Sequence, residues 1–167
     1  ARVAQAVSQG AWQSALAERQ EGVSFFGRSG DAVRRSVERL GVDPSVLYGT
    51  LVLKCPHAAG SDPTDEDLEW LAEEIRIVRP RLIVVMGERT RRAIDALKMP
   101  MSDPLPGVMG TVARWTPAVE ALVVPDIDEY LTNCPRFSRN STYFESLRLS
   151  TPSAFNSVTI RALTSFV

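Results

Sequence analysis

The chain has 167 residues, which is enough for one domain with a single sizeable core. Hydrophobic residues make up 44% and charged residues 23%, ordinary values for a globular protein, and a net charge of −1 excludes a globally basic nucleic-acid binder. No apolar run approaches the roughly 20 residues that span a bilayer, so a transmembrane helix is excluded and no membrane partner is expected.

The first third of the chain predicts a strand or helix, then a helix, then a strand. Residues 2–8 fit a strand, with a helix as the alternative. Residues 30–41 predict a helix that buries Val33 and Val37 and ends at Gly41. Residues 47–54 predict a strand, after which proline and glycine open a loop.

The clearest elements lie between residues 64 and 86. Thr64 as N-cap and Asp67 three residues later predict a capping box at the start of a helix. An apolar stripe at helical spacing follows, made of Leu68, Leu71, Ala72, Ile75 and Val78. Pro80 ends the helix, and the β-branched run at 81–86 predicts a strand buried on both faces, as in a parallel sheet.

The second half continues the alternation of helix and strand. We expect a helix at 88–97, a loop at 99–109, a short or edge strand at 112–115, a strand at 121–124 and a last helix at 143–149. This pattern predicts a three-layer α/β domain over 1–150 with a parallel sheet of about four strands. Residues 151–167 predict an extended tail that contacts a protein partner.

Four segments in series resemble the iron–sulfur type of uracil-DNA glycosylase. Residues 21–30 (EGVSFFGRSG) resemble that family's G-x-P-F-V-G-x-A-G segment, and residues 47–56 (LYGTLVLKCP) its V-Y-I-T-N-V-V-K-C-R-P stretch. Asp62-Pro63-Thr64 and residues 77–87 (IVRPRLIVVMG) resemble its D-P-T and I-R-P-x-x-I-V-x-L-G motifs. Order and spacing agree from about Gly22 to Leu97, so the resemblance implies the glycosylase α/β/α fold with strand order 2-1-3-4.

The resemblance also implies base flipping, stacking of the base on an aromatic ring, reading of its edge by an asparagine, and anion stabilisation by a His-Pro motif. Phe25 matches the stacking ring, although core packing is an equal alternative. The acidic turn falls on residues 10–14, which hold no carboxylate, and the edge-reading asparagine falls on Leu51, which has no donor or acceptor. The His-Pro position falls on residues 124–128, without histidine.

The four cysteines that hold the iron–sulfur cluster in that family are also mostly unmatched in this chain. Cys55 matches one of the four, the helical cysteine aligns near Asp67, and the two amino-terminal cysteines have no counterpart. We therefore expect no iron–sulfur cluster and no other cofactor. A lone pair of cysteines, Cys55 and Cys134, is typical of reduced thiols in an intracellular protein.

The remaining candidates lie in loops expected at the carboxyl ends of strands. Lys54, Arg89 and Arg91 are candidate phosphate ligands, with a solvated helix face as the alternative for Arg91. His57 and Asp126 are candidate catalytic residues if the chain is active. The alternatives are a surface histidine for His57 and a helix N-cap for Asp126.

Three functions compete. The first is a glycosylase-like domain that has lost base excision and binds DNA or RNA, or serves as a structural subunit of a larger assembly. The second is an active DNA glycosylase with an altered site. The third is an unrelated ligand-binding α/β domain, which four motifs in series disfavour.

Overall fold

The structure is a computed structural model that describes residues 5–8, 28–39, 43, 47–54, 61–97 and 99–127. Within these ranges the chain forms strands and helices in alternation. In chain order they are β1 (Gln5–Ser8), α2 (Arg28–Arg39), β2 (Tyr48–Leu51), α3 (Asp65–Val78), β3 (Leu82–Met86), α4 (Glu88–Ala96), β4 (Val112–Thr116) and β5 (Val119–Val124).

These strands form a five-stranded sheet in the order β2-β1-β3-β5-β4. The neighbouring pairs β1–β2, β1–β3 and β3–β5 are parallel, and β4 pairs antiparallel with β5 at the edge. The expected sheet of about four parallel strands is therefore corrected to a mixed sheet of five. The difference arises because Val119 and Glu120 already belong to β5, so that only Pro117 and Ala118 separate it from β4 and the two strands form a hairpin.

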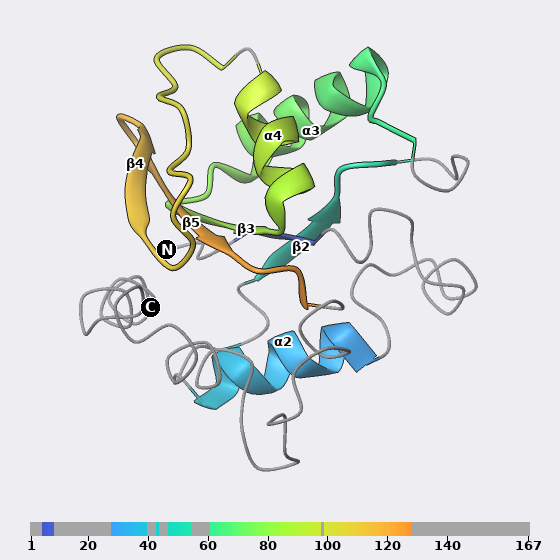
Figure 1. The fold of residues 1–167 in the computed structure, drawn as a ribbon, viewed down its shortest axis with the longest axis vertical. Helices are drawn as coiled ribbons and strands as arrows, with labels where there is room; N and C mark the ends of the chain where they lie inside the picture. The colour runs from blue at the N-terminus through green and yellow to red at the C-terminus, as the bar shows by residue number, and fades with distance from the viewer. Residues whose placement is uncertain are drawn as a thin grey trace.

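Helices cover both faces of the sheet, with α3 and α4 together on one side and α2 on the other (Figure 1). Every residue of β3 is buried, which confirms the prediction of a strand covered on both faces. Ile83 and Val85 pack into the core cluster with α3 and α4, and the residues between them face the other way because side chains alternate along a strand. The architecture is a mixed α/β fold.

Helix α3 begins and ends as its sequence predicts. The Thr64 side chain accepts the Asp67 backbone N–H and the Asp67 side chain accepts the Thr64 backbone N–H, which confirms the capping box. At the other end Arg79 adopts the left-handed conformation at φ 50° and Pro80 follows, so the helix cannot continue.

Other predicted boundaries differ by a few residues. Helix α2 begins at Arg28, before the expected start, and β2 ends at Leu51 rather than continuing to Lys54. The ambiguous amino-terminal segment is a strand, β1. None of the described helices is both long and apolar enough to cross a membrane. The predicted helix at 143–149 and the tail at 151–167 lie outside the described residues.

Candidate functional site at the carboxyl edge of the sheet

The carboxyl ends of the parallel strands meet at one edge of the sheet. Ser8 pairs with Leu51 and Met86 pairs with Val124, and the neighbouring Val7 pairs with Val85, so these strands end at nearly the same level. In parallel α/β sheets, ligands bind at this edge. We therefore take the segments that follow Leu51, Met86 and Val124 as the described part of the candidate site.

Gly87 joins two of these segments. Its backbone N–H donates to the Val124 carbonyl at 2.8 Å, and its own carbonyl accepts the Arg91 N–H at 3.0 Å, which starts α4 directly at the sheet edge. Gly87 has φ 88° and ψ 155°, a conformation that favours glycine. The glycine thus fixes the amino end of α4 beside the end of β5.

The amino end of α4 has no side-chain cap at Gly87. The dipole and free N–H groups of a helix amino end favour an anion. Among the described residues, the Thr90 Oγ1 in the first turn is a buried side-chain oxygen with no hydrogen-bond partner. These features are compatible with an anion at this end of the helix, although the Glu88 carboxylate already supplies negative charge there.

Arg91, a candidate phosphate ligand, donates to carboxylates of its own helix. Its Nε and Nη2 bind the two Glu88 carboxylate oxygens at 2.8 Å each, and Nη1 binds Asp95 Oδ2 at 2.6 Å. Hydrogen bonds from Arg91 lower the pKa of Glu88 to about 2. Most donors of Arg91 are therefore engaged within the helix, as expected for a side chain that stabilises it through pairs three and four residues apart.

Arg89, the second phosphate candidate, bridges α4 to the segment before α3. Its Nη2 donates to the Ser61 carbonyl at 3.1 Å and lies 3.5 Å from Asp62 Oδ1. The side chain is 37% exposed, so it stays accessible to a ligand at the edge. Of the two candidate phosphate ligands on α4, Arg89 is better placed than Arg91 to bind a phosphate.

Lys54, the third phosphate candidate, turns toward α3. Its Nζ donates to Glu74 Oε2 and to Thr50 Oγ1, both at 2.6 Å. Burial lowers the pKa of Lys54, and the hydrogen bond and charge of Glu74 oppose that change. The ammonium group is thus part of a half-buried ion pair that links β2 to α3.

Asp67 holds the segment after β2 against the start of α3. Its Oδ1 accepts the Lys54 backbone N–H at 2.9 Å, and its Oδ2 accepts the Thr64 N–H at 3.0 Å and the Thr64 hydroxyl at 2.7 Å. The residue is only 4% exposed. Three donors therefore occupy this buried carboxylate, and the sequence pattern revealed only the bonds to Thr64.

The residues present do not fit the four-cysteine cluster that the resemblance implies. The chain has two cysteines, Cys55 and Cys134, and both lie outside the described residues. Near the position of the helical cysteine, Asp67 is committed to the hydrogen bonds given above. The described ranges contain no group of three or more metal-ligating side chains.

The structure describes two further positions that the resemblance singled out. Leu51, at the position of the edge-reading asparagine, is 9% exposed and belongs to the buried apolar interior. Asp126 follows β5 by two residues, is 7% exposed, and directly precedes Ile127, the last residue that the structure describes. Asp126 thus lies at the carboxyl edge, close in sequence to the carbonyl that binds Gly87. The other two candidates, Phe25 and His57, lie outside the described residues.

Comparison with known proteins shows similarity to uracil-DNA glycosylases, both in a family model and in individual relatives. The family model described as "Uracil DNA glycosylase superfamily" matches residues 10–162. A protein named "Type-4 uracil-DNA glycosylase" from Pyrobaculum aerophilum is 29% identical over 97 residues, which cover 56% of this chain and 50% of that relative. A protein of the same name from Archaeoglobus fulgidus is 26% identical over 111 residues, which cover 62% of this chain and 56% of the relative. The chain therefore spans about half the length of the curated relatives it matches.

Proposed function

Because this chain belongs to the uracil DNA glycosylase superfamily, we propose that it is a nucleic-acid-binding domain of that fold in which base excision has been lost. We also propose that its parallel strands β2-β1-β3-β5 correspond to the 2-1-3-4 order that the family resemblance implies, with β4 as an additional edge strand. The tail at 151–167 is proposed to contact a protein partner in a larger intracellular assembly.

Leu51 is the observation that carries the proposed loss of activity. It closes β2 at the carboxyl edge and is 9% exposed, so an apolar side chain packs where the resemblance places a base-reading amide. Leucine offers neither a donor nor an acceptor to a pyrimidine edge. In enzyme sites, removal of one well-placed donor typically lowers the rate by about 100- to 1000-fold.

The position of the His-Pro motif supports the same proposal. The segment after β5 has Pro125 and Asp126 in place of the histidine whose N–H would stabilise a departing anion. Two departures at two different strand ends reduce the expected excision rate further.

The amino end of α4 supports the proposal of nucleic-acid binding. It supplies an uncapped helix start, with the partly exposed Arg89 in its first turn. Lys54 and Arg91 stay in the proposed phosphate-binding set only as supporting charges, because their side chains are 18% and 19% exposed and already bond to Glu74 and to Glu88 and Asp95. Phe25 remains the proposed stacking ring.

An active glycosylase with an altered site is the second candidate, and Asp126 is the observation that favours it. The residue is 7% exposed and lies at the edge where a flipped base would enter, a place suited to handling a water molecule. The relatives named as uracil-DNA glycosylases give this candidate further support. In this case His57 and Asp126 are the proposed catalytic residues.

Abasic-site formation separates these two functions. The chain is incubated with duplex and single-stranded oligonucleotides that contain uracil, hypoxanthine or xanthine, and strand cleavage at abasic sites is measured. Under the favoured proposal no base is released above the level without protein. Release that disappears in Asp126→Asn or His57→Ala, and persists in the exposed control Asp103→Asn, would instead establish the active enzyme.

Salt dependence tests the binding half of the proposal. If phosphates are contacted, the affinity for plain DNA or RNA should fall steeply with salt, and Arg89→Gln should reduce the log–log slope by about 1. A slope near zero, or binding that Arg89→Gln leaves unchanged, would contradict nucleic-acid binding at this edge. Co-purification with the full chain, compared with a chain ending at residue 150, tests the proposed protein contact of the tail.

A further inference from the structure

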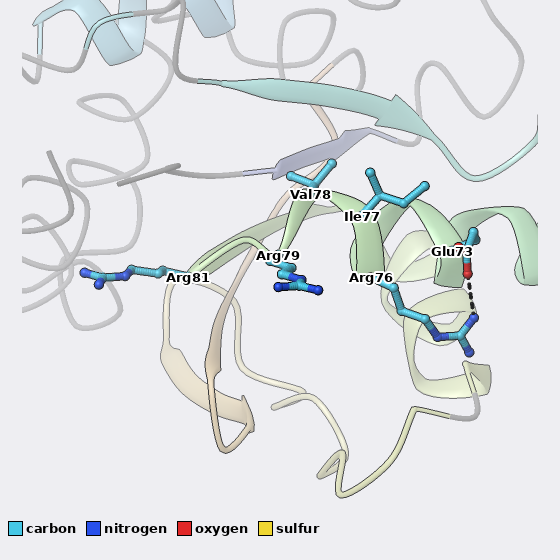
Figure 2. A pocket seen from close by; sticks show the side chains of 6 residues that line it. All are labelled: Glu73, Arg76, Ile77, Val78, Arg79 and Arg81. Atoms are coloured by element: carbon cyan, nitrogen blue, oxygen red, sulfur yellow. Dashed lines mark hydrogen bonds and ion pairs between the residues drawn. The ribbon is translucent and has the colours of Figure 1, made fainter.

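Three arginines are among the residues that line a hollow at the end of the sheet opposite the candidate site. The hollow has a volume of about 590 Å³ and forms where α3 ends and β3 begins (Figure 2). Because Arg81 directly precedes Leu82, the first residue of β3, this is the amino edge of the parallel strands. The residues that line it are Glu73, Arg76, Ile77, Val78, Arg79 and Arg81.

The backbone holds Arg79 and Arg81 in fixed places. The Arg79 N–H donates to the Ile75 carbonyl at 2.9 Å, and the Arg81 carbonyl accepts the Glu120 N–H of β5 at 2.8 Å. The buried Pro80 between them restricts the chain further. The two side chains therefore extend from a rigid turn, not from a free loop.

The charges of these arginines are only partly compensated. Arg76 Nη1 binds Glu73 Oε2 at 3.0 Å, and both side chains are about half exposed. Within the described part of the chain, Arg79 and Arg81 have neither a hydrogen bond nor an ion pair from their side chains. In Figure 2 the Arg79 side chain lies between those of Arg81 and Arg76, with Arg81 extending away from the other two and Arg76 extending toward Glu73.

Arg79 stands where glycine would be the more stable residue. Its φ is 50°, and residues with a side chain meet a steric penalty in this left-handed region that glycine does not. An arginine at this cap therefore costs stability, and no side chain among the described residues bonds to its guanidinium. A residue that is unfavourable for folding, uncompensated in charge and fixed beside a hollow points to a ligand.

We propose that this hollow binds a nucleoside phosphate, through the guanidinium groups of Arg79 and Arg81 with support from Arg76. Planar guanidinium groups match phosphate oxygens in pairs, and several of them suit a ligand with more than one negative charge. The Glu73 carboxylate accepts hydrogen bonds from a sugar hydroxyl or a base amino group, which inorganic phosphate lacks. The exposed Ile77 offers an apolar surface to the nucleoside.

The phosphate comes either from a free nucleotide or from a nucleic-acid strand. In both cases the site is separate from the carboxyl edge, so the inference does not depend on whether base excision has been lost. A duplex bound at the carboxyl edge lies at the other end of the β-strands from this hollow. A nucleic-acid strand in the hollow would therefore be a second segment of nucleic acid.

Calorimetric titration of the full chain tests the proposal, with pyrophosphate, ATP, a short single-stranded DNA and poly-glutamate as separate probes. Arg79→Gly removes one guanidinium and relieves the left-handed strain, so it should fold at least as stably as the parent. We expect Arg79→Gly and Arg81→Gln each to weaken ATP or oligonucleotide binding by about tenfold. Arg35→Gln, an exposed arginine of α2, is the matched control and should leave the affinity unchanged.

The probes also distinguish the source of the phosphate. Binding of ATP in competition with the oligonucleotide identifies a free nucleotide, and binding of the oligonucleotide alone identifies a strand. Arg89→Gln, at the carboxyl edge, should weaken oligonucleotide binding there and leave ATP binding intact, so failure of either proposal is visible separately. Three results would each overturn the inference: no probe binds, poly-glutamate binds as tightly as ATP, or Arg79→Gly and Arg81→Gln both bind as the parent does.

Discussion

The Asp67 carboxylate accepts the backbone N–H of Lys54 at 2.9 Å and so ties the segment after β2 to the first turn of α3. The same carboxylate caps its own helix through Thr64. One buried side chain therefore performs two tasks, and it does so near a position where the family resemblance implies a metal-ligating cysteine.

Replacement of Asp67 should destabilise the fold. Asp67→Ala leaves the Lys54 and Thr64 donors without an acceptor in a buried place, and we expect a loss of about 2–4 kcal/mol in the free energy of unfolding. Urea denaturation measures this loss. The control Asp65→Asn changes an exposed residue in the same helical turn and should stay within about 0.5 kcal/mol of the parent. If both variants unfold at the same urea concentration, the carboxylate does not hold the loop.

The stabilising effect of Glu88 should depend on pH. Hydrogen bonds from Arg91 lower the pKa of Glu88 from its ordinary 4.5 to about 2 in the folded chain. A lowered pKa means that ionised Glu88 stabilises the folded state above about pH 4.5, and that this stabilisation is lost as the pH falls through about 2.

Comparison of the parent with Glu88→Gln in urea at pH 7 and at pH 2.5 tests this dependence. Because the side chain is 41% exposed, solvent screening limits the difference at pH 7 to about 1 kcal/mol. The difference should shrink at the lower pH. An equal difference at both values would show that the ion pair with Arg91 contributes nothing.

The pKa of Lys54 should fall further when Glu74 loses its charge. Burial already lowers this pKa, and Glu74 partly restores it by hydrogen bonding and charge. Glu74→Gln removes the charge and so should lower the Lys54 pKa. Lys54 and Lys98 are the only lysines in the chain, so an NMR titration of labelled lysine has few signals to assign, and Lys54→Arg identifies the relevant one. A Lys54 pKa that stays the same or rises in Glu74→Gln would exclude the pairing.

Two glycines should respond oppositely to alanine. Gly87→Ala places a side chain at φ 88° and ψ 155°, a conformation that only glycine adopts without strain. We expect it to lower the free energy of unfolding by about 1–3 kcal/mol. At Gly107 a new Cβ would meet no atom within 4 Å, so Gly107→Ala should be neutral or slightly stabilising. Thermal unfolding of the two variants gives the comparison. Equal losses at both positions would remove the argument that Gly87 is conformationally required.

Local signals in the sequence predicted local structure well. The capping box of Thr64 and Asp67 depends on residues three apart, and it is confirmed. The β-branched run before Gly87 forms the fully buried β3. The sequence does not reveal the β4–β5 hairpin, because Val119 and the charged Glu120 come soon after Pro117 and do not extend the apolar run at 121–124.

Contacts between distant segments could not be predicted in the same way. The bond from Lys54 to Asp67 crosses 13 residues and the ion pair of Lys54 with Glu74 crosses 20, and neither spacing has a periodicity that reveals it. The sequence does not distinguish Arg91 as a phosphate ligand from Arg91 on a solvated helix face, because its charge suits both. Only the geometry identifies Glu88 and Asp95 as its partners. Of the predicted site residues, the structure therefore relates Lys54, Arg89, Arg91 and Asp126 to the carboxyl edge, while Phe25 and His57 remain predictions.

The hairpin of β4 and β5 bears on how the chain folds. Its strands are joined by Pro117 and Ala118 alone, whereas each described parallel pair requires a long connection to close first. Pairings between sequence neighbours lose less chain entropy and tend to form sooner, so we expect this hairpin to form before β3 pairs with β5. A turn that favours the hairpin would then speed refolding, and the slow step would be the arrival of β1 between two strands that come later in the chain.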